Sequence, residues 1–369
     1  DTDNNQAAME RFAEARACAE RAGDERRIAQ VICNVGNVYL NRGEIVTARD
    51  IYLDAAKRAR SIGDDPLLAH IIGNLGLVHR HLGEPVAAIR YLEEAIDIES
   101  RTGNESGRAR HLGNLGSVFQ EVGDLQRSVA LYEEALGIHR QTGQRHNEAT
   151  WLHNLGVLHQ TLGDLDAALQ HYEASEVIFH ELGAEMAEAR SKARKGGVHL
   201  QRSEFEDAVV LLGQSLEVAK RNENETEMAI YRSNLGHAFA RSGNFAKAQE
   251  HLNAAIPILE SHDNRHQIAV VWHYQGNVLS DRRNQDRDVN AAIILIERSL
   301  AEFQAIDAKR NVIDSHLALG ELFRENGEWE KVAMHVQMAA EMQATLINEE
   351  TKIQTQRLYY QRQIQDIQR

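Results

Sequence analysis

The sequence predicts an all-α protein, built as an elongated array of antiparallel helix pairs. One pattern recurs along the chain every 40 residues, and a fixed interval of this size is typical of stacked two-helix units. Pro is rare, with 3 in 369 residues, and Phe, Trp and Tyr together make up 5%. This composition disfavours an all-β fold, which needs many turns and aromatic strands.

The first helix of each unit carries Asn-Leu-Gly or a variant of it. The glycine recurs every 40 residues until the last interval, which is 44 residues and predicts a four-residue insertion. We expect this glycine to lie where the two helices of a pair cross, because a larger side chain would push them apart. The glycines at this position are Gly36, Gly76, Gly116, Gly156, Gly196, Gly236, Gly276 and Gly320.

A turn and a second helix follow in each unit. Seven residues after Gly36 and Gly116 come Gly43 and Gly123, and Asp124 follows the latter. Glycine commonly ends a helix in the left-handed conformation, and Asp or Asn caps the next helix. Small and aromatic residues then recur at helical spacing, as in Ala48 and Tyr52 and their counterparts in later units.

These motifs resemble the tetratricopeptide repeat, with its Leu-Gly-x-x-Tyr and Ala-x-x-x-Phe patterns. Leu115-Gly116 with Phe119 and Val35-Gly36 with Tyr39 carry the first pattern, and the resemblance covers residues 24–345, about eight repeats. The period of 40 is similar to the repeats of kinesin light chain, Pins-type adaptors and bacterial sensor regions. The resemblance implies a right-handed superhelical solenoid whose first helices line a concave wall.

Both ends of the chain fall outside this array. Residues 1–23 match the second helix of an earlier, truncated repeat, with Phe12 placed 40 residues before Tyr52, so we expect a piece of a longer protein. In residues 346–369, Leu346, Ile353, Tyr360 and Ile367 are spaced by seven. One interpretation is a coiled-coil lead that joins a homodimer and continues into a missing output domain. The other is a solvated capping helix.

Charge and motifs exclude several classes of function. The net charge of -14 disfavours nucleic acid and anionic membranes as partners, and the longest apolar run, residues 291–296, is too short to cross a bilayer. Cys18 and Cys33 have no metal-binding spacing, and His262 and His266 flank a predicted loop rather than a zinc site. We therefore predict a cytoplasmic protein with no enzymatic activity, no cofactor and no metal.

The resemblance places a row of asparagines on the concave wall. In the related families the Asn before Leu-Gly holds peptide backbone, and an amide suits this role because it both donates and accepts hydrogen bonds. The alternative is that each Asn bonds a neighbouring helix and only sets the superhelix. The positions are Asn34, Asn74, Asn114, Asn154 and Asn234.

Cationic residues lie near this row, which holds few acids. Arg110 and Arg190 come one turn before the Asn position, and in the fifth unit Arg194-Lys195 replaces Asn-Leu. Arg190 and Arg194 are one helical turn apart and suit a carboxylate or phosphate of the ligand. The alternative is a degenerate repeat with Lys195 turned out to solvent.

These observations predict a non-enzymatic scaffold that binds an extended, acidic peptide or protein segment. We expect it to be the sensing region of a larger signalling protein. The alternative is a freestanding adaptor that bridges two protein partners.

Overall fold

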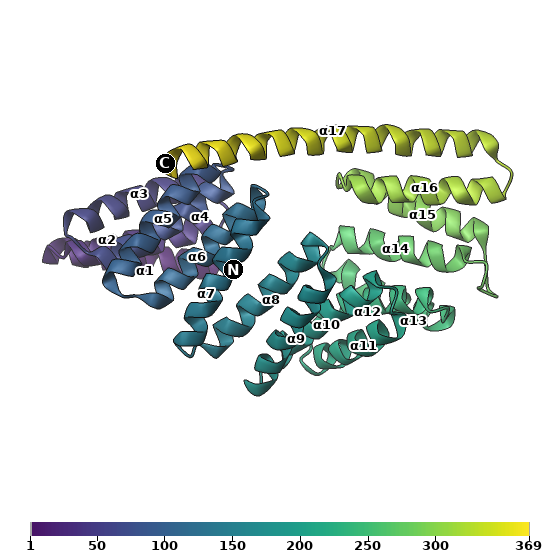
Figure 1. The fold of residues 1–369 in the computed structure, drawn as a ribbon, viewed down its shortest axis with the longest axis horizontal. Helices are drawn as coiled ribbons and strands as arrows, with labels where there is room; N and C mark the ends of the chain where they lie inside the picture. Colours follow the sequence, from purple (N-terminus) through teal and green to yellow (C-terminus); the bar gives the residue numbers. More distant parts are fainter. Residues whose placement is uncertain (1, 369) are drawn as a thin grey trace. The chain divides into compact units, whose positions relative to one another are not determined.

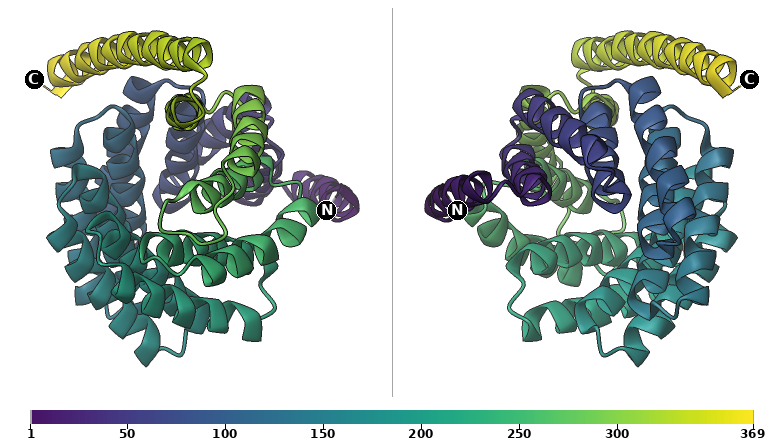
Figure 2. Two further views of the ribbon diagram at one scale, coloured as in Figure 1. Left: turned by 90° about the vertical axis from the view of Figure 1, so that its right-hand side faces the viewer. Right: turned by 90° about the vertical axis from the view of Figure 1, so that its left-hand side faces the viewer.

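The computed structural model describes residues 2–368, which form seventeen α-helices and no strand within that range (Figure 1). The chain divides into two compact units, residues 1–151 with 354–369, and residues 152–353. Figure 2 shows from two further sides that the helices follow one another in chain order within each unit. The all-α prediction is confirmed.

The first unit contains α1 to α7, the start of α8 and the end of α17. The second contains the rest of α8 and the helices up to most of α17. The bounds are α1 Thr2–Ala22, α2 Glu25–Asn41, α3 Ile45–Ser61, α4 Asp65–His81, α5 Pro85–Thr102, α6 Glu105–Glu121, α7 Leu125–Gln141, α8 Arg145–Leu162, α9 Leu165–Glu181, α10 Glu185–Gln201, α11 Phe205–Arg221, α12 Glu225–Arg241, α13 Phe245–Ser261, α14 Arg265–Ser280, α15 Val289–Ala305, α16 Lys309–Glu325 and α17 Trp329–Gln368.

The recurring glycine of the first helix lies against the second helix of its own pair. A Cβ added at Gly116 would come within 2.6 Å of the Tyr132 ring, and one at Gly156 would meet the Tyr172 ring at the same distance. The predicted role of these glycines is therefore confirmed. Gly320 is the exception, because its nearest neighbour, Val336, is 3.4 Å away.

The turns between helices follow the predicted glycine and cap pattern. Gly43 has φ +75°, and the Asp124 side chain accepts a hydrogen bond from the Arg127 N–H to cap α7. Where the glycine is missing in the fifth repeat, Ser203 takes the left-handed conformation itself, at φ 61°. Such a conformation strains a residue with a side chain.

The first helices of successive pairs pack on one another by matching a small residue to a large one. A Cβ at Gly73 would come within 2.0 Å of His111, and one at Gly113 within 1.9 Å of the Trp151 ring. In each pair the two residues lie on successive first helices, 38 residues apart, or 42 residues apart across the insertion, and either helix can supply the large residue. The described pairs are Gly73 with His111, Gly113 with Trp151, Ser191 with His153, Ala193 with Tyr231, and Ser315 with His273.

The C-terminal helix α17 is 40 residues long and has no break at residue 346. Of the predicted coiled-coil seam, Leu346 is partly buried and Ile353 is 48% exposed. Tyr360 packs against the core cluster of Leu92, Leu115 and Phe119 in the first unit. The side chain of Ile367 lies outside the described residues, as does that of Ala8, which matches Ala48 in the repeat register.

None of the described helices combines the length and the hydropathy that crossing a bilayer requires.

Candidate functional site

The predicted asparagine row lies on the first helices of the pairs. Within each unit these helices touch one another, as α2 does α4 and α10 does α12, whereas the described second helices are joined mainly through the first. All five asparagines are partly buried, three in the first unit and two in the second: Asn34, Asn74 and Asn114, and then Asn154 and Asn234.

The hydrogen bonds of the row differ between its members. The Asn74 Nδ2 atom donates to Asn37 Oδ1 at 3.2 Å, and the buried Tyr52 hydroxyl donates to the same oxygen at 2.6 Å. The interpretation that an Asn ties neighbouring helices together therefore applies to Asn74. Among the described residues no side-chain hydrogen bond engages the other four, Asn34, Asn114, Asn154 and Asn234.

Arg110 is the cation beside the row in the first unit. It is exposed, and no ion pair engages it within the described part of the chain. Its charge adds to burial in lowering the pKa of His70 and in lowering that of the buried His111 to about 3. Both imidazoles are therefore neutral near pH 7, and Arg110 is the positive charge at this point of the face.

A pocket of about 310 Å³ in the second unit brings three predicted site residues together. It lies on α8, α10 and α12, and Asn154 is not among its lining residues. We call it the α10 pocket. Its lining consists of His153, Gln160, Arg190, Ala193, Arg194, Gly197, Glu227, Ile230, Tyr231 and Asn234.

The two arginines of the α10 pocket are not equivalent. The Arg190 Nε atom donates to Glu227 Oε1 at 2.8 Å, and the Glu227 side chain is only 18% exposed. Arg194 is also exposed, and no described residue forms an ion pair or hydrogen bond with it. Of the two arginines, Arg190 is thus held from α12, and Arg194 has no described ion-pair partner.

Aromatic and imidazole rings surround Arg194. The His153 Nδ1 atom lies 3.1 Å from the Ser191 hydroxyl, and the His153 ring meets the Tyr172 ring edge-on. Burial, together with the charges of Arg194 and Arg190, lowers the pKa of His153 to about 4. Burial raises the pKa of Tyr172 to about 12 despite the opposing charge of Arg194. The α10 pocket therefore presents neutral rings and fixed guanidinium charges at pH 7.

The structure adds an acid to the few expected on the first-helix faces, because Glu227 of the sixth repeat lines the α10 pocket. It also corrects one alternative for the fifth repeat. Lys195 does not turn out to solvent, since its Nζ atom donates to Glu176 Oε2 at 3.0 Å on the neighbouring α9. The spacing could have indicated Glu227, because it lies 37 residues after Arg190, the separation that also joins Asn37 to Asn74.

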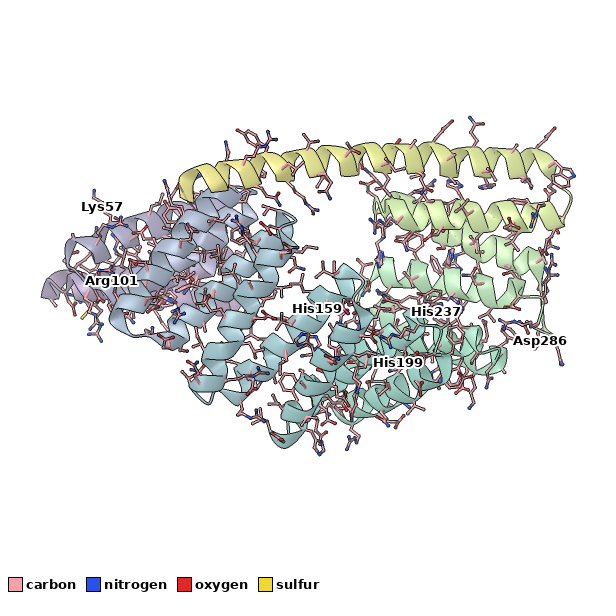
Figure 3. The ribbon with its side chains drawn as sticks, viewed as in Figure 1. Lys57, Arg101, His159, His199, His237 and Asp286 are labelled. Atoms are coloured by element: carbon pink, nitrogen blue, oxygen red, sulfur yellow. The ribbon has the colours of Figure 1, made fainter. Side chains whose placement is uncertain are left out.

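One group of side chains in the described residues could hold a metal ion. The ligand atoms of His199, Glu204 and Asp207 lie within 4.8 Å of one another. His199, labelled on α10 in Figure 3, is 2.6 Å from Glu204, and His79 is at the same distance from Glu84 three repeats earlier in the sequence. Because the pair recurs without a third acid, its role is to join the end of one helix to the cap of the next.

Comparison with known proteins agrees with this geometry. A stack of helix pairs whose first helices carry the glycine ladder defines a helical repeat protein. The sequence profile of the tetratricopeptide repeat matches residues 27–99, 107–176 and 185–261, more than half of the chain. The chain belongs to the tetratricopeptide repeat family. No curated protein sequence matches it.

Several solved structures share the fold at low identity. BtubC (BKLC) from P. vanneervenii is 21% identical with a TM-score of 0.54, and the match covers 60% of this chain and 91% of that one. A STAND signal-transduction ATPase with a tetratricopeptide repeat sensor from Pyrococcus horikoshii is 12% identical with a TM-score of 0.64, covering 97% and 55%. The quorum sensor NprR from B. thuringiensis is 10% identical with a TM-score of 0.62, covering 92% and 99%.

Proposed function

We propose that this protein is a non-enzymatic regulatory scaffold that binds an extended peptide or protein segment on the first-helix faces of its repeats. The observation that carries the proposal is the set of four partly buried asparagines whose amides have no described partner. An amide that is half-removed from water and unpaired gains a hydrogen bond when a ligand supplies one. Asn114 in the first unit and Asn234 in the second would each pair with ligand backbone.

The ligand that suits these faces carries acidic side chains. Arg110 in the first unit and Arg194 in the second are exposed cations without a described ion pair. A hydrogen bond to a charged group contributes about 1.5–3 kcal/mol, against roughly 0.5–1.5 kcal/mol for a neutral one. Acidic groups would therefore fix the register of the ligand, while the asparagines hold its backbone.

The sensing region of a larger signalling protein is the setting we favour. Two of the structures with this fold, the quorum sensor and the ATPase with a repeat sensor, are described as sensors. A freestanding adaptor that bridges two partners is the second candidate. The two differ in whether peptide binding changes the activity of a linked output domain.

The test is a selection of binders from a random peptide library displayed on phage, followed by titration of the selected peptide. We expect recovery of peptides rich in Asp or Glu. For a peptide that binds to the second unit, replacing Asn154 and Asn234 together by Ala should weaken binding at least tenfold, because backbone hydrogen bonds of about 1 kcal/mol each are lost. For a peptide that binds to the first unit, the corresponding variant replaces Asn34 and Asn114.

The matched control is Asn326→Ala, which removes an exposed asparagine in the turn after α16. This variant should bind as the parent does. Failure of the selection to yield any binder, or equal affinity of the matching double variant and the parent, would show that the asparagine row is structural.

A further inference from the structure

The charges of the α10 pocket can be counted element by element. Helix α10 contributes Arg190 and Arg194, and helix α12 contributes Glu227. Helix α8 contributes His153, which is neutral at pH 7. Tyr231, also on α12, is neutral, since burial raises its pKa. The nearby lysines of α10 point elsewhere: Lys192 pairs with Glu188 and Lys195 with Glu176. Two cations and one anion leave the pocket with a net charge of +1.

The Arg190–Glu227 contact also fixes how Arg190 is presented. Glu227 accepts from the Nε atom of Arg190 at 2.8 Å, so this contact does not use the Nη groups, which can still donate to a ligand. Glu227 is mostly buried, whereas Arg190 is 53% exposed. The carboxylate is therefore the anchored member of the pair, and the guanidinium is the member that faces solvent.

We propose that Glu227 is a specificity-determining and positioning residue that makes the α10 pocket select a single carboxylate over a phosphate. This inference rests on the proposed function, since it concerns the acidic group of the same ligand. Arg194 would pair with the ligand carboxylate. Arg190, held by Glu227 through its Nε atom, would donate hydrogen bonds to the same carboxylate from its Nη groups. A phosphoryl group carries nearly two negative charges at pH 7.5, and the second would be repelled by the anchored Glu227 carboxylate.

The experiment uses three acetylated and amidated nonapeptides of Ala and Ser that differ only at the central residue, which is Glu, Gln or phosphoserine. Each carries a rhodamine label, and binding to the full chain is followed by fluorescence anisotropy at pH 7.5. We expect the Glu peptide to bind about tenfold more tightly than the other two. Arg194→Ala should reduce its affinity to that of the Gln peptide.

Glu227→Gln should reverse the preference. The substitution keeps the shape of the side chain, raises the pocket charge to +2, and should strengthen phosphoserine binding about tenfold relative to Glu. Glu227→Asp keeps the negative charge and should keep the preference for the Glu peptide. This variant therefore distinguishes the effect of the lost charge from a general effect of substitution on folding. Arg221→Ala removes a 65%-exposed arginine of α11 outside the pocket and is the matched control.

The outcomes separate the two proposals. If the Glu and Gln peptides bind equally, or if the Glu-to-phosphoserine ratio is the same in the parent and in folded Glu227→Gln, the role of Glu227 is refuted while the scaffold stands. If none of the three peptides binds and the phage selection also fails, both proposals are refuted.

Discussion

The fold changes the charge state of two partly buried histidines, one on α8 and one on α12. Burial, with help from neighbouring cations, lowers the pKa of His153 and of His237 to about 4. His237 lies on α12, where Figure 3 labels it, and stacks on Tyr274 with ring centroids 4.4 Å apart. Each ring is therefore kept neutral in the folded chain, although an unfolded histidine has a pKa near 6.5.

Acid should destabilise the protein through these residues. Below pH 6.5 the histidines of the unfolded chain become protonated, whereas these two stay neutral in the folded chain. The free energy of unfolding therefore falls between pH 6.5 and about 4. At pH 5.5 each of the two should contribute about 1 kcal/mol of the loss. Urea unfolding at pH 7.5, 6.5 and 5.5 measures it.

A histidine variant tests the assignment. His153→Gln should reduce the loss of unfolding free energy between pH 7.5 and 5.5 by the contribution of one histidine. His180→Gln removes a side chain that is 77% exposed and serves as the control. A parent protein equally stable at pH 7.5 and 5.5 would contradict the prediction.

At the scale of helices, the packing between successive first helices depends on size matching. Gly113 gives room to the Trp151 ring, which would otherwise meet a Cβ at 1.9 Å. In contrast, Gly137, one turn before the end of α7, has nothing within 4 Å of the place where a Cβ would stand. Both glycines have a helical backbone conformation, but only Gly113 has a side chain packed against it.

Replacing these glycines by Ala should have opposite effects. Gly113→Ala should cost about 1–3 kcal/mol through overpacking, while Gly137→Ala should stabilise by up to about 1 kcal/mol, because Ala favours a helix over Gly. Chemical denaturation measures both. Adding Trp151→Leu to Gly113→Ala should recover part of the loss, and purely additive effects of the two substitutions would argue against the packing account.

Much of this arrangement follows from the sequence, but the contacts that depend on the register between repeats do not. The 40-residue period, the glycine ladder and the turn caps predict the helices and their pairing, because each depends on residues close in the chain. Glu227 was not predicted, because its role depends on a contact between two helices that are distant in the sequence. Its partner Arg190 lies on the preceding first helix, so the contact depends on the register between repeats. The same holds for Lys195, whose partner Glu176 is on α9.

At the scale of the whole chain, the role of the last helix is a prediction that dimerisation can test. Ile353 is exposed and Tyr360 packs in the first unit's core cluster, so the seam predicted for residues 346–369 has no uniform environment. If the seam joins two chains, ending the protein after Thr345 should halve the mass that light scattering measures. An unchanged mass after truncation would favour the capping helix, which in isolation should be marginally stable.

The matched first helices restrict how such an array can change during evolution. Unequal crossing-over removes or adds whole 40-residue periods, and this brings together helices that were never neighbours. Loss of one period could set His153 against Tyr231, two large side chains, or Gly113 against Ser191, two small ones. The first junction would clash and the second would leave a void. Although the repeats look alike, their order along the chain is fixed by these junctions, and a functional lineage should change repeats in place more readily than it shuffles them.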